Sequence, residues 1–450
     1  MSTFTFGFAG DDIDDIDDQD VEIEEPDAGI NAGIRQLEIV GKKNEGEDGA
    51  LIEASYCDLD DMLSILPSQI SYSMLSISSQ SSAPGAPRLA IPRREVFDIR
   101  AQLMAEDDVD TNENAELISG LEKGDLRPTV YEGGLKTWEC AIDLAKLVAA
   151  EEVPSLLSEM EDGESEDIHI IELGAGTAIP SLAILHHFLS QPAPQSPPRR
   201  SIRFVFADYN AAVLRLVTVP NILLTWHTCR HHLNYPQQPE GNILPTTENG
   251  TNTDSSLNRN YGDSADDDEQ PDLDIDPTLF STFREDLHTR GISLSFISGA
   301  WSPAFVELAL PHHPRSSPSS QPRGTNLLIL ASETIYSPAS LRAFSETLLA
   351  LLRRGDELGF VSASTSALPL ELVTGPAVID KNASPKSKTK ALIAAKKVYF
   401  GVGGGVDEFL GVMRDVGRRE GKAGDDGFFV KERVEVRDEG VGRVVLEVTV

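Results

Sequence analysis

The chain has 450 residues, and 73 Asp and Glu against 38 Lys and Arg give it a net charge of −35. This acid excess disfavours a nucleic-acid-binding scaffold, because such proteins present basic faces to phosphates. No run of 18 apolar residues occurs, so we expect no membrane-spanning helix. The N-terminal residues lack the pattern of a secretory signal, and the three cysteines are too widely spaced for a disulfide framework. We therefore expect a reducing compartment, with the protein in the cytoplasm and nucleus.

The acidic residues are concentrated in three segments. Residues 1–60 carry a net charge of −15, and residues 151–167 and 254–276 carry −8 each, which leaves −4 for the rest of the chain. This charge favours a basic protein as the partner, through long-range attraction. Because residues 1–60 also lack a periodic apolar pattern, we expect them to be an acidic disordered tail. Residues 61–127 regain apolar content and predict a partly ordered N-terminal extension.

Residues 128–450 alternate between strand and helix patterns. Short apolar runs rich in β-branched residues predict strands at 168–173, 202–207, 292–297, 326–331, 358–363 and 442–450. Helical spacing lies between them, at 138–150, 179–188, 211–226, 338–353 and 406–416. This alternation predicts one α/β domain with a Rossmann-like, mostly parallel twisted sheet and helices on both faces. Polar insertions are expected at about 189–200, 236–285 and 311–324.

A candidate ligand-binding turn, Gly174-Ala-Gly176, follows the first of these strands. Glycines at this place let backbone N–H groups approach a ligand that a Cβ would exclude. A plain tight turn is the alternative. A dinucleotide-binding fingerprint requires a third glycine where this chain has Ile179, which disfavours a dehydrogenase.

Further candidate residues follow the other strands. Asp208 ends the second strand, where an acid can accept hydrogen bonds from ribose hydroxyls; a helix N-cap is the alternative. Trp301 either stacks on an adenine ring or packs in the core. In open α/β sheets, ligands bind beyond the carboxyl ends of the strands, and all of these residues fall there. The pattern favours an adenosine-type site.

Six segments of the chain together resemble a known family: Tyr131–Cys140 (YEGGLKTWEC), Glu172–Gly176, Asp208–Asn210, Val217–Asn221, Gly299–Trp301 and Ser332–Tyr336. They look like the seven-β-strand S-adenosylmethionine-dependent methyltransferases, and most like their protein-histidine N-methyltransferase branch (methyltransferase family 16-like). The resemblance covers about 128–450. It implies a seven-stranded sheet, S-adenosyl-L-methionine as cofactor, and methyl transfer to a histidine of a basic large-subunit ribosomal protein. A protein-lysine methyltransferase and a non-catalytic binding protein on the same fold remain alternatives.

The resemblance also implies roles for individual residues. Glu333 and Tyr336 would act near the acceptor, where either one can fix the histidine tautomer. We expect a monomer without direct nucleic-acid or membrane contact, and no metal site, because the spacing of His227, Cys229 and His231 matches no standard zinc site. The residues implied to bind the cofactor are Thr137, Trp138, Glu139, Cys140, Ala141, Gly174, Gly176, Asp208, Tyr209, Asn210, Gly299, Ala300, Trp301 and Ser332.

Overall fold

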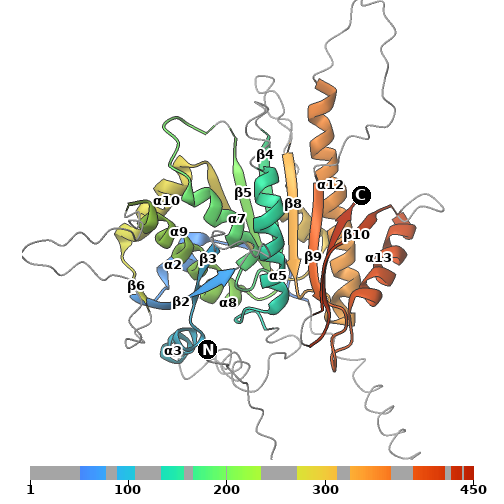
Figure 1. Cartoon of the computed structure of the whole chain (residues 1–450), viewed down its shortest axis with the longest axis horizontal. Helices are drawn as coiled ribbons and strands as arrows, with labels where there is room; N and C mark the ends of the chain where they lie inside the picture. The colour runs from blue at the N-terminus through green and yellow to red at the C-terminus, as the bar shows by residue number, and fades with distance from the viewer. Residues whose placement is uncertain are drawn as a thin grey trace, which may run out of the picture. The chain divides into compact units, whose positions relative to one another are not determined.

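Strands alternate with helices along most of the chain in the computed structural model (Figure 1). The structure describes residues 51–77, 89–106, 133–156, 166–198, 200–234, 271–311, 325–365, 389–420, 427–437 and 440–450. The chain divides after Leu51, and everything below concerns the unit from Ile52 to Val450. Most of the predicted acidic tail, residues 1–50, lies outside the described residues. So do residues 312–324 of the insertion predicted at 311–324, and more than half of the acidic run at 151–167.

A large, mostly parallel sheet forms the centre of this unit, as the sequence predicts. The five strands from β7 to β9 pair in parallel, and the remaining pairings are antiparallel. The described sheet has one strand more than the seven expected, because residues 55–57, predicted as part of the tail, pair with its edge. The strand order is β1 (Ser55–Cys57), β7 (Ile292–Ser298), β5 (Ile202–Asp208), β4 (Asp167–Leu173), β8 (Thr325–Ser332), β9 (Thr389–Lys396), β11 (Arg443–Thr449) and β10 (Phe429–Val436).

One predicted strand is wrong. Helix α12 (Pro338–Thr365) runs through residues 358–363, and the fifth parallel strand is β9 instead. Gly355 does not end this helix. A Cβ at Gly355 would lie 2.4 Å from a methyl group of Leu327 and 2.8 Å from one of Thr389, so the glycine allows the helix to pack closely against β8 and β9.

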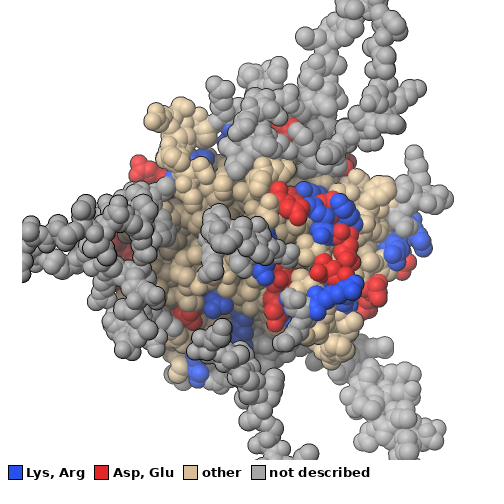
Figure 2. Space-filling view, in the orientation of Figure 1, with Lys and Arg blue, Asp and Glu red and all other residues tan. Residues whose placement is uncertain are grey.

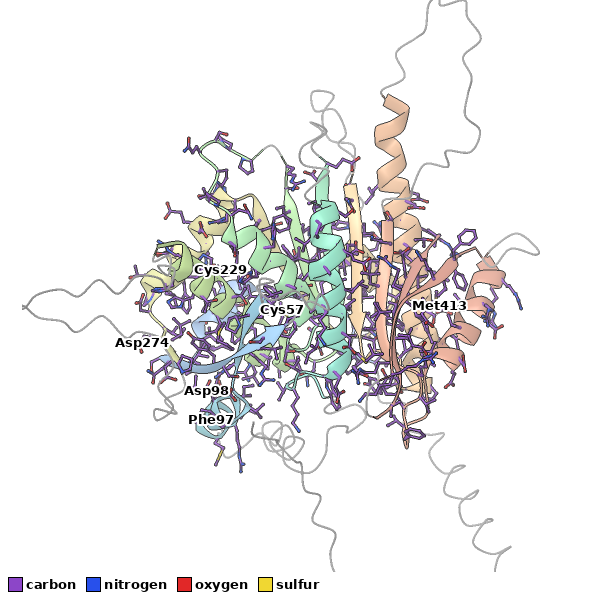
Figure 3. All side chains as sticks on the ribbon, viewed as in Figure 1. Cys57, Phe97, Asp98, Cys229, Asp274 and Met413 are labelled. Carbon is purple, nitrogen blue, oxygen red and sulfur yellow. The ribbon has the colours of Figure 1, made fainter. Side chains whose placement is uncertain are left out.

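Helices cover both faces of the sheet (Figure 1), and alternate residues of the inner strands supply two separate cores. In β4, Ile168 and Ile170 face the first core, and Ile171 and Leu173 face the second. Met413, labelled in Figure 3, is buried in the second core. The first face carries α5 (Glu139–Leu147) with the π-helical turn η1 (Val148–Glu152), α7 (Ile179–Ser190), η2 (Leu214–Thr218), α9 (Val219–Asn234) and α10 (Pro277–Thr289). The second face carries α11 (Pro303–Ala309), α12 and α13 (Val406–Glu420). The short helix α8 (Ala211–Val213) packs in a smaller third cluster with Ile99 and Leu103.

The N-terminal extension contributes a small second sheet. Its strands lie in the order β3 (Leu89–Arg94), β2 (Gln69–Ile77) and β6 (Asp272–Asp274), and it is accompanied by α2 (Leu59–Ser64) and α3 (Val96–Ala105). Strand β6 and the start of α10 fall within the insertion predicted at 236–285. Residues 271–285 are therefore structured, whereas 236–270 lie outside the described residues.

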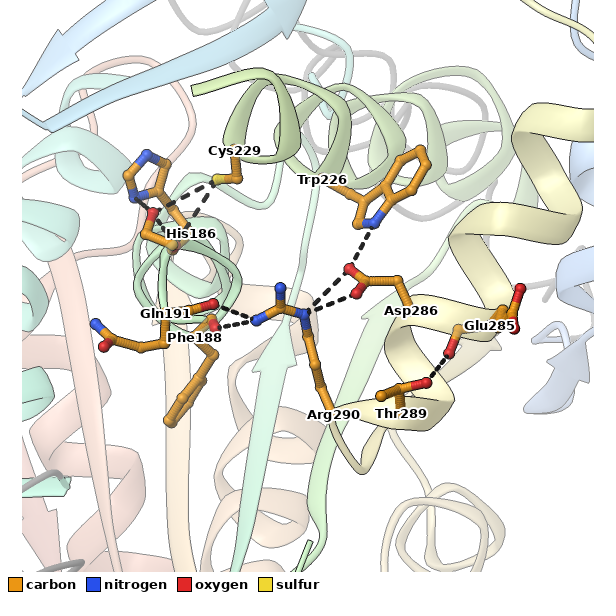
Figure 4. A network of polar contacts seen from close by, with 10 residues as sticks. His186, Phe188, Gln191, Trp226, Cys229, Glu285, Asp286, Thr289 and Arg290 are labelled. Carbon is orange, nitrogen blue, oxygen red and sulfur yellow. Dashed lines mark hydrogen bonds and ion pairs between the residues drawn. The ribbon is translucent and has the colours of Figure 1, made fainter. Parts of the chain in front are cut away.

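Helix α10 is held to its neighbours by the polar network in Figure 4. The Arg290 guanidinium donates to the carbonyl oxygens of Phe188 (3.1 Å) and Gln191 (2.7 Å) at the end of α7. Asp286 pairs with Arg290 and accepts a hydrogen bond of 2.9 Å from the Trp226 indole of α9. The sequence does not reveal the contacts with Phe188, Gln191 and Trp226, because these partners of α10 lie 60 or more residues away along the chain.

In the view of Figure 2, positive and negative side chains gather mainly on the right, where they lie next to one another, and much of the rest of the described surface is uncharged. Glu152 from the acidic run is only 3% exposed, and it pairs with Lys390 of β9 and with Arg433 of β10. Asp143 of α5 pairs with Arg443 of β11. Paired acids of this kind add little long-range charge, so the described sheet region is not an acidic surface. Among the helices that the structure describes, none is long and apolar enough to span a membrane.

Candidate functional site

The glycine turn after β4 is joined to the end of β5. Gly174 and Gly176 adopt φ values of 67° and 49°, a left-handed backbone that favours glycine. The Asp208 carboxylate accepts hydrogen bonds from the N–H groups of Gly176 and Asn210, both at 3.1 Å. Asp208 is therefore not a helix N-cap; Asn210 caps α8 by accepting from the N–H of Ala212 at 2.8 Å. The carboxylate lies where the two strand ends meet.

Two buried polar side chains are hydrogen-bonded to the backbone of the glycine turn. The Thr218 hydroxyl donates to the carbonyl oxygen of Gly176 at 2.7 Å, and the Asn221 amide donates to that of Thr177 at 3.0 Å. The Asn221 side-chain oxygen accepts from the N–H of Arg94 at 2.8 Å, which ties β3 to the same place. The sequence does not predict these roles. A signal in the sequence is that Thr218 and Asn221 are polar residues in an otherwise apolar helical segment. The structure shows that both are fully buried.

The segment before α5 lies against the glycine turn. The Thr137 hydroxyl donates to the Thr177 hydroxyl at 3.1 Å, and a Cβ at Gly176 would lie 3.2 Å from the carbonyl oxygen of Gly134. The Trp138 indole donates to the carbonyl oxygen of Gly133 at 2.9 Å, which closes the loop. Trp138 occupies the N-cap position of α5 without a side-chain cap bond, and Cys140 and Ala141 are buried in the first helical turn.

The end of β7 reaches the same edge. Gly299, with φ of 115°, donates its N–H to the carbonyl oxygens of Asp208 and Tyr209 at 3.2 Å. Ala300 donates to the carbonyl oxygen of Ile52 at 2.9 Å, and a Cβ at Gly299 would lie 2.7 Å from the Cα of Ala54. The segment leading into β1 therefore packs directly on this strand end.

Trp301 packs on the second face of the sheet. Its ring meets those of Phe305 and Phe344 edge-on, with centroids 5.0 Å and 6.1 Å apart. These contacts agree with the core alternative for this tryptophan, and stacking on an adenine stays a prediction. Ser332 ends β8 in register with Ala394 of β9, and is half-buried, as is Tyr209.

Glu333 is held in an unusual backbone conformation beside the strand ends. Its φ of 55° is in the left-handed region, where a non-glycine residue carries strain of about 1–3 kcal/mol. Its carboxylate accepts hydrogen bonds from the Cys140 thiol and the Tyr399 hydroxyl. Burial and the Glu333 charge raise the pKa of both groups, so both remain protonated donors. The Oε1 atom of Glu333 is buried without a hydrogen-bond partner among the described residues.

Lys396 links Glu333 to the start of α5. Its ammonium lies 3.2 Å from the Glu139 carboxylate, 3.9 Å from Glu333 Oε1 and 5.3 Å from the centre of the Trp138 ring. Burial by itself would raise the pKa of Glu139, but a backbone hydrogen bond and Lys396 lower it overall. The backbone N–H of Lys396 donates to the Tyr399 hydroxyl at 3.2 Å. These residues from β8, β9 and α5 form one connected polar group.

Lys396 and Tyr399 are site residues that the sequence does not reveal. They lie in and after an apolar stretch that carries no recognised motif, and only the register of β9 against β8 brings them to Glu333. Tyr336 is close by, with its ring centroid 6.3 Å from that of Tyr399. The described residues contain no group of three or more His, Cys, Asp or Glu side chains able to hold a metal ion.

Comparison with known proteins decides between the chemistries that this edge permits. No protein-family model matches the chain. It is 30% identical over 422 residues to histidine protein methyltransferase 1 of Saccharomyces cerevisiae, covering 92% of this chain and 91% of that protein. The chain belongs to the histidine protein methyltransferase 1 family. The Schizosaccharomyces pombe protein of that name is 29% identical (78% of this chain, 74% of that protein), and the Rattus norvegicus homolog is 26% identical (75% and 62%).

Membership of the histidine protein methyltransferase family confirms the predicted resemblance and implies a methyl donor. The residues at the strand ends fit a nucleoside-containing donor in two respects. The turn after β4 carries glycines with positive φ at the carboxyl end of a parallel strand, which is where open α/β sheets bind nucleotides; the space beside Gly174 itself is filled by a Thr334 methyl group, 2.7 Å from the place of a Cβ. Asp208 supplies a carboxylate at the next strand end, where a ribose is bound in open α/β sheets.

The structure gathers the residues predicted for this methyltransferase at one edge of the sheet, and divides them into two groups. Gly176 and Asn210 both donate to the Asp208 carboxylate, and Thr137 and Gly299 are bonded to the same turn and strand end. Trp138, Glu139, Cys140 and Glu333 meet instead around Lys396. The contact of each residue with donor or acceptor stays a prediction.

Proposed function

We propose that this histidine protein methyltransferase transfers the methyl group of S-adenosyl-L-methionine to a histidine ring nitrogen of a basic protein, namely a large-subunit ribosomal protein. We further propose that it acts as a monomer in the cytoplasm and nucleus. The observation that carries the acceptor side is Glu333. Its carboxylate is fixed by two protonated donors, and its buried Oε1 remains open to one more hydrogen bond.

On the donor side, S-adenosyl-L-methionine supplies a methyl group that its sulfonium charge already activates. Asp208 would accept hydrogen bonds from the ribose hydroxyls, and the glycine turn would admit the ligand close to its backbone. The turn is rigid, because Thr218, Asn221 and Thr137 all bond to it. A rigid site loses less entropy when a ligand binds than one that has to be ordered first.

On the acceptor side, the task is positioning rather than strong base catalysis. The histidine side chain loses its positive charge with a pKa near neutrality. The neutral ring then carries a lone pair on one nitrogen and a hydrogen on the other. Glu333 Oε1 would accept the hydrogen bond from the protonated nitrogen, which directs the lone pair of the other nitrogen to the methyl group. Alignment of this kind lowers the barrier by removing wrong tautomers and orientations.

The proposal is tested with acid-extracted large-subunit ribosomal proteins from a Saccharomyces cerevisiae strain that lacks its own histidine protein methyltransferase 1. The extract is incubated with tritiated S-adenosyl-L-methionine and the wild-type protein or Glu333→Ala. We expect one protein to be labelled, and the rate to fall by about tenfold or more in the variant. Labelling of other basic proteins, but of no large-subunit protein, would contradict the proposed substrate.

A further inference from the structure

A short hairpin follows β9 next to the Glu333 group. Residues 397–405 turn back on themselves: Val398 bridges to Gly405, the N–H of Tyr399 donates to the carbonyl oxygen of Gly404 at 3.3 Å, and Gly403 donates to that of Tyr399 at 3.2 Å. We call this segment the 397–405 hairpin. Its tip is built from glycines with positive φ, which fixes a tight and specific loop shape.

The inner side of the hairpin is part of the acceptor group. Tyr399 donates to the Glu333 carboxylate, and its ring packs against that of Tyr336. A Cβ at Gly404 would lie 2.3 Å from the carbonyl oxygen of Tyr336, and one at Gly403 would lie 3.1 Å from the Pro338 ring. Glycine therefore allows the hairpin to press directly on the segment that carries Glu333 and Tyr336.

The outer side of the same hairpin is apolar and exposed. Val398, Phe400 and Val402 alternate with Tyr399 along the chain, and their exposed fractions are 48%, 78% and 41%. A single exposed apolar residue is normal in a soluble protein, but three on one loop mark a binding surface when they border a functional site.

The charges around the hairpin indicate what would bind it. Asp407 and Glu408, exposed in the first turn of α13, follow it directly. The two lysines at its base are paired, Lys396 with Glu139 and Glu333, and Lys397 with Glu435. An apolar loop flanked by exposed carboxylates suits a basic polypeptide with apolar side chains near its target residue.

We propose that the 397–405 hairpin binds the histidine-bearing segment of the basic protein substrate, with Phe400 and Val402 as the main apolar contacts. This inference rests on the proposed function. It assigns the hairpin two faces with separate tasks: Tyr399 on the inside positions Glu333, while the outer side chains hold the substrate chain so that its histidine reaches Glu333 Oε1. Substrate affinity and cofactor affinity are then carried by different surfaces.

The test compares Phe400→Ser and Val402→Ser with a matched control, Phe429→Ser. Phe429 is 74% exposed, similar to Phe400. It begins β10 and pairs with Thr449, which places it near the start of β9, whereas the hairpin follows the end of β9. Initial rates are measured against limiting amounts of the acid-extracted large-subunit proteins, and S-adenosyl-L-methionine affinity is measured by titration calorimetry.

We expect Phe400→Ser to lower kcat/KM for the protein substrate by about tenfold, Val402→Ser to lower it less, and Phe429→Ser to leave it unchanged, with cofactor affinity equal in all four proteins. Equal rates for Phe400→Ser and Phe429→Ser would overturn the docking role, and would leave the proposed function intact if the wild-type protein labels its substrate. No labelling by the wild-type protein would overturn the proposed function and this inference together.

Discussion

The side-chain carboxylate of Asp208 accepts a hydrogen bond from the backbone N–H of Gly176 at 3.1 Å, and so joins the ends of two neighbouring parallel strands. The same carboxylate accepts from the N–H of Asn210, also at 3.1 Å. One acid therefore shapes the glycine turn and the start of the following helix, in the place where the donor's ribose is proposed to bind.

Replacing Asp208 by Ala should weaken binding of S-adenosyl-L-methionine by about tenfold or more, because both the proposed ribose contact and the link to Gly176 are lost. Titration calorimetry measures this directly. Asp208→Asn keeps an oxygen acceptor without the charge, so its affinity for S-adenosyl-L-methionine should lie between those of Asp208→Ala and the wild type. An unchanged dissociation constant in Asp208→Ala would show that this carboxylate does not face the donor.

Thr218 positions the turn from a fully buried site, so its hydroxyl should matter for folding and for cofactor binding. Thr218→Val keeps the shape but leaves the carbonyl oxygen of Gly176 without its 2.7 Å partner, and should lower the free energy of unfolding by about 1–3 kcal/mol. Urea unfolding and calorimetry with S-adenosyl-L-methionine give the two readouts. Thr218→Ser retains the hydroxyl and should recover most of the loss in cofactor affinity; equal affinity in Thr218→Val and Thr218→Ser would argue against a positioning role.

Removing the Tyr399 hydroxyl should affect turnover more than cofactor binding. Tyr399→Phe deletes a donor to Glu333 and leaves the backbone N–H of Lys396 without its acceptor, so the carboxylate loses its fixed orientation. We expect kcat to fall by about tenfold, with donor affinity within about twofold of the wild type. Tyr336→Phe and Glu333→Ala should likewise lower kcat more than they lower the affinity for the donor. Equal losses of kcat and of donor affinity would place these residues on the donor side instead.

Glu172 should make stability depend on pH. Burial raises the pKa of this carboxyl to about 8 from its ordinary 4.5, and a hydrogen bond from the N–H of Ser181 opposes the shift only in part. Because the folded state holds this proton more tightly than the unfolded state, its contribution is complete below pH 4.5 and is lost as the pH rises through 8.

Glu172→Gln replaces the titratable carboxyl group by a neutral amide. The pH dependence of its stability therefore serves as the comparison for the wild type. Between pH 5 and pH 8, the wild-type free energy of unfolding should fall relative to the variant by at most about 1.4 kcal/mol for each pH unit. Urea unfolding of both proteins at several pH values measures the difference. Parallel stability curves for the two proteins would show that Glu172 titrates normally.

The sequence predicts the first four parallel strands because each is a short apolar run that ends at a glycine or a polar residue. It misplaces the fifth, because a short apolar run such as residues 358–363 looks the same in a helix and in a strand, and α12 continues past Gly355 through this run. Strand β10 has no such run. Half of its eight residues are charged and all are at least partly exposed, so no apolar pattern marks its pairing with β11.

The residues of the candidate site likewise divide into those that the sequence locates and those that it does not. Gly176, Asp208 and Glu333 stand at strand ends that the pattern of the chain locates, so the sequence predicts that they lie at the same edge of the sheet. Lys396 and Tyr399 depend on the register between β8 and β9, and no local pattern reports a register between strands separated by a long helix.

The identity of the methylated side chain tests the central claim most directly. The large-subunit protein labelled with tritiated S-adenosyl-L-methionine is hydrolysed to amino acids, and the radioactive product is identified by chromatography against methylated standards. We predict that the label elutes as methylhistidine. Label that elutes as methyl-lysine would contradict histidine as the acceptor, even if every donor-side prediction holds.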